Sequence, residues 1–269
     1  MSRPRATLEQ IWPRVAIVAL ILVLWWAAVA SGHWSRHVLP APGDVWHALT
    51  AELTDSDGLL VAAERSVFRL FIGLLVAIAV GTPIGLAMAG SKVAQRSVGS
   101  VMVGLQALPP IAWLPLAVVW LGFTERAVVF VVIAGAVPAI AVATASALRL
   151  VAPALIRTGR TLGANGLRLY SRVVLPAAVP GYLGGLQQAW AIAWRALLAA
   201  EILHTGARGL GHLIFQAGDV PGRTGATSQF DTALILATMV VIMIVGIGID
   251  WLFALVDRRV RARRGLLVA

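Results

Sequence analysis

Apolar residues run along this chain in six long stretches that contain no Asp, Glu, Lys or Arg. A helix needs roughly 20 apolar residues to cross about 30 Å of hydrocarbon. Five stretches meet that length, and the last meets it if the helix continues past Asp250 to Val256. The pattern therefore predicts an all-α polytopic membrane protein with six transmembrane helices. The six stretches are residues 15–35, 70–91, 97–124, 127–148, 173–194 and 232–249.

Composition supports a membrane protein and removes several other classes. The 269 residues are 59% hydrophobic and 13% charged, whereas an ordinary soluble domain is roughly 25% charged. So much apolar surface could not be buried in one soluble core. The chain has no cysteine, which excludes disulfides, thiolate catalysis and cysteine-based metal sites.

The distribution of basic residues predicts how the spans face. Cytoplasmic loops of membrane proteins are enriched in Lys and Arg. Both ends of the chain, together with the loops after the second and fourth spans, hold fifteen of the 22 basic residues. We therefore expect both termini in the cytoplasm. The net charge of +10 then reflects topology and contact with membrane lipid, and no nucleic acid partner is expected.

Three segments follow from this topology. Residues 1–64 hold the first span and an external loop, 65–257 hold five spans, and 258–269 form a basic cytoplasmic tail. In the external loop, Asp44 follows a proline-rich turn and is expected to cap a short helix over 45–53. Its amphipathic character favours a position along the outer membrane surface.

The first span also has features of a cleavable signal peptide. Basic residues precede it, and Ala28-Val29-Ala30 follows its apolar part. However, Trp25 and Trp26 stand where a signal peptide normally has Leu or Ala, and the apolar run is long enough to span. We therefore expect this segment to be retained, which N-terminal sequencing would test.

Prolines interrupt the third predicted span, which contains Pro109, Pro110 and Pro115. Each proline removes a backbone donor and clashes with the preceding turn. Broken helix at membrane depth is tolerated only against protein or a water-filled cavity, so this span is expected to face the interior of the assembly. Glycines such as Gly81 and Gly85 are explained by close helix packing alone, but breaks and glycines together favour a translocation pathway.

Four ionisable residues lie within or at the edge of the spans. Such residues are costly in lipid, so each is expected to face protein or water. Arg69 and Asp250 are near span ends, where extension of the side chain to the membrane surface is the simplest expectation. Arg195 and Glu201 are deeper, and a spacing of six residues does not let them pair within one helix.

A polar stripe precedes Arg195 on the fifth span, because Gln187, Trp190 and Trp194 share one helical face. Such a stripe suits either a path for a polar solute or a buried network of hydrogen bonds. A positive charge on the path would favour an anion, whereas Glu201 is better suited to bracing the helix. The candidate pathway residues are Gln106, Pro109, Pro110, Gln187, Trp190, Trp194, Arg195 and Glu201.

The cytoplasmic segment 150–174 is basic and too polar to enter lipid. Leucine and isoleucine recur in it at helical spacing, with arginines between them. This predicts short amphipathic helices between spans four and five, suited either to docking on a soluble partner or to lying on lipid.

The same segment contains a motif. Gly163-Ala164-Asn165 and then Val173-Val174-Leu175-Pro176 reproduce a glycine followed, after nine residues, by Ile/Val-x-Leu-Pro. This pattern resembles the cytoplasmic signature of the permeases of bacterial ABC importers. The family signature opens with Glu-Ala-Ala, where this chain has Arg157-Thr158-Gly159.

Further stretches, in the same order, resemble the nitrate, sulfonate and taurine branch of that family. Together they cover about residues 65–257, and an arginine at position 195 is not expected in that branch. The stretches are 108–116, 120–122, 175–180, 185–186, 200–201 and 209–211.

The resemblance implies a non-catalytic permease subunit of the bacterial inner membrane. It implies partnership with a second permease copy, with two ATPase subunits that carry ATP and Mg²⁺, and with an external solute-binding protein. The implied solute is a small anion such as an aliphatic sulfonate, taurine or nitrate. The residues implied for the ATPase-coupling loop are Arg157, Arg160, Leu162, Gly163, Ala164, Asn165, Leu175 and Pro176.

Two other classes were weighed from the residues themselves. A transporter driven by an ion gradient would need repeated halves and paired carboxylates at mid-membrane, and only Glu201 lies that deep. A membrane enzyme would need an intramembrane catalytic or metal site, and no pair of residues resembles one. Segment 85–92 lacks the spacing of a phosphate-binding loop, so no cofactor or metal is expected in this chain.

Overall fold

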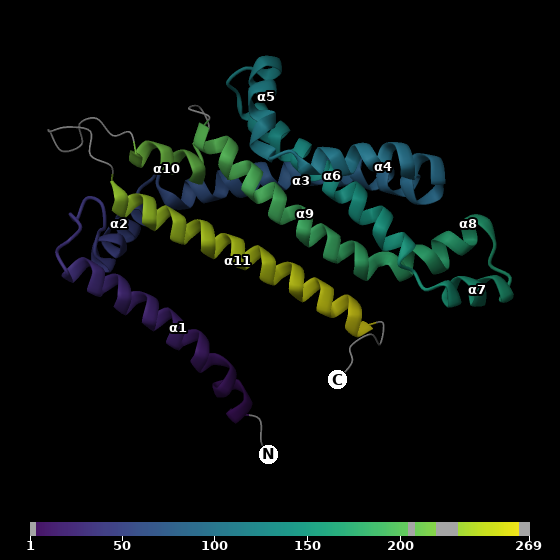
Figure 1. Ribbon diagram of the computed structural model, residues 1–269, viewed down its shortest axis with the longest axis horizontal. Coiled ribbons are helices and arrows are strands. Elements are labelled where there is room, and N and C mark those ends of the chain that lie inside the picture. The colour runs from purple at the N-terminus through teal and green to yellow at the C-terminus, as the bar shows by residue number, and fades with distance from the viewer. Residues whose placement is uncertain (1–3, 204–207, 219–230, 264–269) are drawn as a thin grey trace. The chain divides into compact units, whose positions relative to one another are not determined.

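The computed structural model describes residues 4–203, 208–218 and 231–263, and every regular element within them is helical (Figure 1). The all-α prediction is therefore confirmed. The elements are α1 (Pro4–Ala30), α2 (Pro42–Thr54), α3 (Leu59–Gly90), α4 (Lys92–Ala107), the 3-10 helix η1 (Pro110–Trp113), α5 (Leu114–Leu121), α6 (Glu125–Arg149), α7 (Pro153–Thr161), α8 (Gly166–Leu169), the π-helix η2 (Tyr170–Val174), α9 (Leu175–Leu203), α10 (Leu210–Gly218) and α11 (Thr232–Arg263).

The chain divides into two compact units. One unit contains Met1–Val61 with Leu213–Val241, and the other contains Ala62–His212 with Ile242–Ala269. The predicted segments 1–64, 65–257 and 258–269 were based on membrane topology, and they stay predictions. Of the predicted basic tail, residues 264–269 lie outside the described residues.

In the first of these units, α2 is longer than the helix predicted over 45–53. It begins at Pro42, whose fixed φ and missing N–H suit a first helical turn. Asp44 is therefore inside the first turn rather than before it, and its carboxylate accepts a hydrogen bond of 2.9 Å from the backbone N–H of Ala41. The predicted role of Asp44 in starting the helix holds, although its predicted position as N-cap is wrong.

The core of the other unit consists of α3, α6 and α9, which approach closely through glycines and alanines. A Cβ atom added to Gly85 of α3 would lie 2.5 Å from the carbonyl oxygen of Ala141 on α6. A Cβ atom added to Gly181 of α9 would lie 3.3 Å from the Cβ atom of Ala147, on the same helix α6. Small residues thus let both helices pack against α6 at near backbone contact.

Three helices among the described residues are long and apolar enough to cross a membrane, namely α3, α6 and α11. The bent pair made of Lys92–Ala107 and Pro110–Leu121 gives a fourth if it is counted as one span. In α1 the apolar helix Val15–Ala30 is shorter, and α9 has 29 residues. The number of six spans and the cytoplasmic position of the termini stay predictions.

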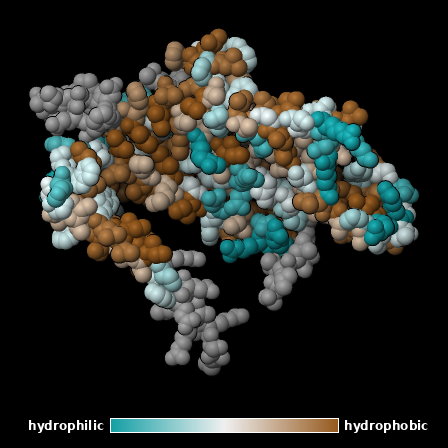
Figure 2. Space-filling model, in the orientation of Figure 1, coloured by the Kyte–Doolittle hydropathy of each residue, from teal (hydrophilic) through white to brown (hydrophobic). Residues whose placement is uncertain are grey.

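Apolar side chains cover much of the face seen in Figure 2, and hydrophilic residues gather both in the middle of the view and near α7 and α8. Many large apolar side chains are exposed, including Val119 at 79% and Phe71 at 59% of their surface. Exposed apolar surface on this scale suits contact with lipid rather than with water.

The third predicted span, residues 97–124, is not one straight helix. Its first part belongs to α4, which ends at Ala107, and the chain then turns by 100° before continuing as η1 and α5. Pro109 and Pro110 occupy the break, whereas Pro115 lies in the first turn of α5, where its missing N–H costs nothing. The predicted interruption is confirmed.

Candidate functional site

A recess of about 290 Å³ lies at the break between α4 and η1. Gly135 of α6 allows the close approach that closes one side, because a Cβ atom there would lie 3.3 Å from the Cβ atom of Pro110. The recess brings together four predicted pathway residues from distant parts of the chain. Its lining consists of Leu105, Gln106, Ala107, Leu108, Pro109, Pro110, Gly135, Ile192 and Arg195.

Arg195 enters this recess from α9, which also contributes Ile192 one turn earlier. Arg195 is exposed. The Nε–H of Arg195 donates a hydrogen bond of 3.0 Å to the carbonyl oxygen of Ala191 in the preceding turn. The guanidinium group is thus held by its own helix at one nitrogen.

The tryptophans of the predicted polar stripe lie elsewhere on α9. Trp190 and Trp194 are only 2% and 7% exposed. The Trp190 ring stacks on Phe253 of α11 at a centroid distance of 6.4 Å, and its Nε1–H donates a 2.8 Å hydrogen bond to Oδ1 of Asp250. These two side chains therefore pack in the interior against α11. Gln187 is half-buried and is not part of the recess lining.

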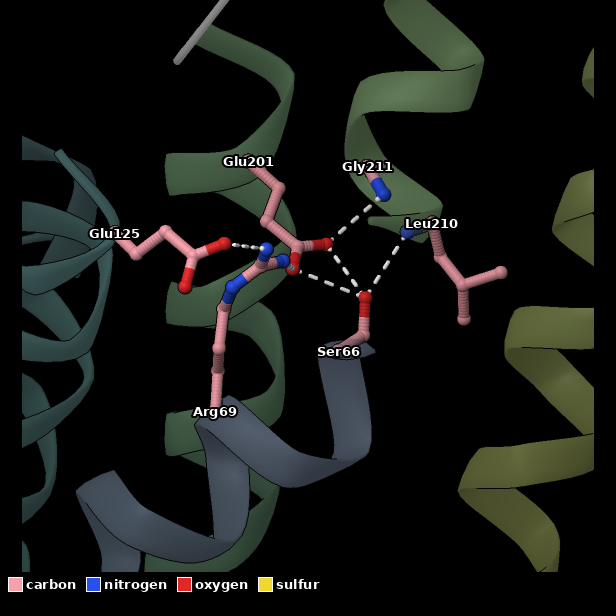
Figure 3. Close-up of polar contacts among 6 residues, drawn as sticks. All are labelled: Ser66, Arg69, Glu125, Glu201, Leu210 and Gly211. Carbon is pink, nitrogen blue, oxygen red and sulfur yellow. Dashed lines mark hydrogen bonds and ion pairs between the residues drawn. The ribbon is translucent and has the colours of Figure 1, made fainter. Parts of the chain in front are cut away.

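Glu201, near the end of α9, is completely buried in a polar network (Figure 3). Its carboxylate accepts hydrogen bonds of 2.8 and 2.9 Å from the hydroxyl of Ser66 and one of 3.1 Å from the backbone N–H of Gly211. Nη1 of Arg69 forms an ion pair with it at 2.8 Å. The network joins α3, α9 and the start of α10.

The same arginine also contacts α6. Nη2 of Arg69 lies 2.7 Å from Oε1 of Glu125, which begins α6 and is 67% exposed. The predicted extension of Arg69 to the membrane surface is therefore wrong, since its side chain is 4% exposed and lies between two carboxylates. Asp250, for which the same extension was expected, is exposed but bonded to Trp190.

Segment 150–174, which was predicted to be cytoplasmic, contains α7, α8 and η2, beside the start of α9 (Figure 1). Gly163 ends α7 with a φ of +84°, a conformation that L side chains rarely adopt. The N–H of Gly163 donates to the carbonyl of Arg160 at 3.0 Å, and the N–H of Ala164 donates to that of Gly159 at 2.9 Å. This pair of bonds is the glycine-terminated helix end that satisfies the last carbonyls.

Gly159 explains how α7 packs. It is buried, and a Cβ atom there would lie 2.9 Å from Cδ1 of Leu169 and 3.1 Å from Cγ2 of Val173. Position 159 matches the last small residue of the family's Glu-Ala-Ala, so the structure accounts for a small side chain there. Arg157, which stands at the position of the family's glutamate, is exposed.

The exposed surface of this segment carries both apolar and basic side chains, and we call it the loop surface. Leu162 and Leu167 are 82% and 86% exposed, although leucine is among the residues most often buried. The segment has four arginines and no acidic residue. The exposed arginines are Arg157, Arg160, Arg168 and Arg172, the first two of them on α7; Asn165 is exposed, Ala164 is half-buried, and Leu175 and Pro176 begin α9.

A second recess, of about 420 Å³, lies among α3, α6, η2 and the start of α9. Leu175 and Pro176 line it, together with Tyr182, whose hydroxyl shares a 2.8 Å hydrogen bond with the hydroxyl of Thr82. Its lining has no ionisable group apart from the tyrosine. Within the described residues, no group of three or more His, Asp or Glu is placed to hold a metal ion.

Sequence reasoning missed Ser66 and Glu125. Neither stood out, because Ser66 is an uncharged residue outside the predicted span, and a glutamate is ordinary in the first turn of a helix. The signal that pointed in this direction was Glu201 itself, since a buried carboxylate requires partners.

The fold is that of known ABC transporter permeases. The inward-facing MetNI methionine ABC transporter matches with a TM-score of 0.61 and 22% identity, over 75% of this chain and 95% of that one. A crystal structure of an amino acid ABC transporter with histidines matches with a TM-score of 0.60 and 16% identity, over 74% and 92%. At these identities the likeness concerns the fold alone.

Curated relatives are also permeases. A putative ABC transporter permease protein of Methanocaldococcus jannaschii is 34% identical over 69% of this chain and 66% of its own length. The taurine transport system permease protein TauC of Escherichia coli is 26% identical over 96% of this chain and 91% of its own. The nitrate import permease protein NrtB of Synechocystis is 28% identical over 91% and 87%.

A family model also matches residues 81–262, which include α6, both recesses and segment 150–174. The family is one of transport permeases rather than of catalytic subunits. Its description names a binding protein and places the component in the inner membrane. Because the family model matches most of its length, this chain belongs to the family of inner membrane components of binding-protein-dependent transport systems.

Proposed function

We propose that this chain is the transmembrane subunit of an ATP-driven importer that passes a small anion from a binding protein to the cytoplasm by alternating access. The loop surface is the observation that carries the proposal, because exposed leucines beside arginines suit a protein partner better than water. The relatives named for taurine and nitrate support a solute that carries an anionic group.

In this proposal the assembly contains two copies of the chain, two ATPase subunits that bind ATP and Mg²⁺, and an external solute-binding protein. Each copy crosses the bacterial inner membrane six times with both termini in the cytoplasm. The 29 residues of α9 support a fifth span, since an α-helix rises about 1.5 Å per residue and about 20 residues suffice to cross.

The solute path runs beside α9 and the broken helix pair in this proposal. The recess at Pro109 and Pro110 supports that position, because non-helical backbone at membrane depth belongs next to a cavity. Glu201 is buried among protein groups and contributes by bracing α9 rather than by touching the solute.

The test is uptake into vesicles that contain the permease, with the ATPase and binding protein encoded by neighbouring genes. The proposal expects uptake of an aliphatic sulfonate or nitrate to require ATP on the side of the membrane that carries the ATPase subunits. Uptake should continue when ion gradients are collapsed. Uptake that continues without ATP and stops with the gradient would instead establish the secondary transporter.

The loop surface gives a sharper prediction. Leu162→Ala is expected to weaken binding of the ATPase by about tenfold or more, because an exposed leucine that becomes buried at an interface contributes roughly 1.5–3 kcal/mol. The fold should persist, since Leu162 is 82% exposed and ends α7 without packing. Co-purification of the ATPase, titrated by concentration, measures the loss.

The matched control is Val93→Ala, which removes a side chain of similar exposure, 75%, outside the loop surface. That variant should bind the ATPase as the wild type does. Equal binding by Leu162→Ala and the wild type would remove the loop surface from the interface.

A further inference from the structure

The recess at the helix break has the composition of an anion site. Arg195 is the one charged residue among its nine lining residues, and no acidic side chain lines it. The positive charge is therefore not neutralised by a neighbour within the lining. Gln106, the other polar lining residue, is exposed and carries an amide that donates hydrogen bonds.

We propose that this recess is a binding site within the permease for a small oxyanion, such as a sulfonate or nitrate, with Arg195 as its principal ligand and Gln106 as the second. The inference rests on the proposed function in taking the transported solute as the occupant. It goes further in giving the permease its own selection for anions, in addition to that of the binding protein.

The conformation of the Arg195 side chain suits a ligand for an oxyanion. Its Nε–H is bonded to the Ala191 carbonyl, which fixes the plane of the guanidinium group. No hydrogen bond or ion pair joins Nη1 or Nη2 to another group in the part of the chain that the structure describes. Two parallel N–H groups on one edge match two oxygens of a planar or tetrahedral oxyanion, which is the strongest geometry for an arginine.

Carbonyl oxygens next to a proline break would repel an anion, and two of those beside this break already accept backbone hydrogen bonds. The Leu105 carbonyl accepts from the N–H of Leu108 at 3.3 Å, and the Pro109 carbonyl accepts from that of Ala112 at 2.9 Å.

The size of the recess limits the occupant. Pockets for drug-sized ligands span roughly 300–1,000 Å³, and this recess of about 290 Å³ is at the lower end. A solute of a few heavy atoms fits, with its charged group on Arg195 and a short apolar part against Leu105, Leu108 and Ile192. A charged group joined to a short apolar part is the structure of a short alkanesulfonate.

The test uses the complex of permease and ATPase in nanodiscs of phosphatidylcholine, without the binding protein, and measures binding of radiolabelled ethanesulfonate. Wild type is expected to bind it, and Arg195→Ala to weaken binding about tenfold or more, as loss of a charge-assisted bidentate contact requires. Arg195→Lys should bind with intermediate affinity, because a lysine is a point charge without the planar fork. Gln106→Leu should reduce binding by a smaller factor.

Arg126→Ala is the matched control, since Arg126 is an exposed arginine outside the recess, and its binding should equal that of the wild type. A uniform loss in Arg195→Ala and Arg126→Ala would mean attraction to net charge and would overturn the site. Folding of Arg195→Ala is not in question, because the side chain is exposed and bonded only within its own helix.

A lipid phosphate is the other source of the same oxyanion chemistry. If the wild type binds no ethanesulfonate in phosphatidylcholine but retains anionic phospholipid in an Arg195-dependent way, the solute site is overturned. Vesicle uptake separates the two proposals. Uptake that is ATP-dependent and equal in Arg195→Ala and the wild type removes the site and leaves the importer, whereas Arg195-dependent binding without ATP-dependent uptake leaves the site and removes the importer.

Discussion

Replacing Glu201 with alanine is expected to lower the free energy of unfolding by about 3–5 kcal/mol, which is the usual cost of breaking a buried ion pair on one side. The substitution leaves the Arg69 guanidinium buried with one carboxylate instead of two, and leaves the Ser66 hydroxyl and the Gly211 N–H without their acceptor. The joint between α3, α9 and α10 is lost. Thermal unfolding of the purified permease in detergent, followed by tryptophan fluorescence, measures the change.

A pair elsewhere in the same chain provides the control. Asp257 and Arg261 form a partly exposed ion pair at 2.7 Å within α11, four residues apart, and ion pairs at this helical spacing are worth about 0.3–0.5 kcal/mol. Asp257→Ala should therefore unfold close to the wild-type temperature. If Glu201→Ala did the same, the buried network would not stabilise the fold.

The second large effect is expected at Gly185. Its added Cβ atom would overlap the Cβ atom of Ala143 on α6, and neither group can rotate away. Gly185→Ala should therefore push α6 and α9 apart and destabilise the protein by about 1–3 kcal/mol, as overpacking does. The same unfolding measurement, together with the yield of monodisperse protein, reports it.

Substitution of the adjacent residue, Gly184, should have the opposite effect on stability. A Cβ atom on Gly184 meets nothing within 4 Å, and alanine is favoured over glycine in a helix by about 1 kcal/mol. Gly184→Ala should thus be neutral or stabilising. Two neighbouring substitutions of identical chemistry that gave equal effects would contradict the packing of α9 on α6.

Much of the fold can be predicted from the local pattern of the sequence, whereas contacts between residues far apart in the chain cannot. The break at Pro109 and Pro110 was predictable because proline acts on its own turn. The helices of segment 150–174 were predictable from the helical spacing of its leucine and isoleucine residues. The partners of Glu201 were not, because Ser66 and Arg69 are 135 and 132 residues away in the chain, and nothing local selects them.

The candidate site shows the same division. Sequence alone placed Arg195, Trp190 and Trp194 on one helix, but it could not assign each side of that helix to a neighbour. The structure directs the tryptophans toward α11 and Arg195 toward the break after α4. That separation depends on how α9 packs, which is set by Gly181, Gly185 and the helices around them.

The π-helical turn η2 has a consequence for how related chains are aligned. The N–H of Leu175 donates to the carbonyl of Tyr170, five residues earlier, and Pro176 has no N–H with which to restore an α-helical turn. One turn thus accommodates an additional residue, and each residue in an α-helix corresponds to about 100° of rotation. A relative that is one residue shorter between Tyr170 and Val174 would keep the same side of α9 toward α6. The same gap placed inside α9 would turn position 195 out of its recess, so single-residue gaps belong in this turn.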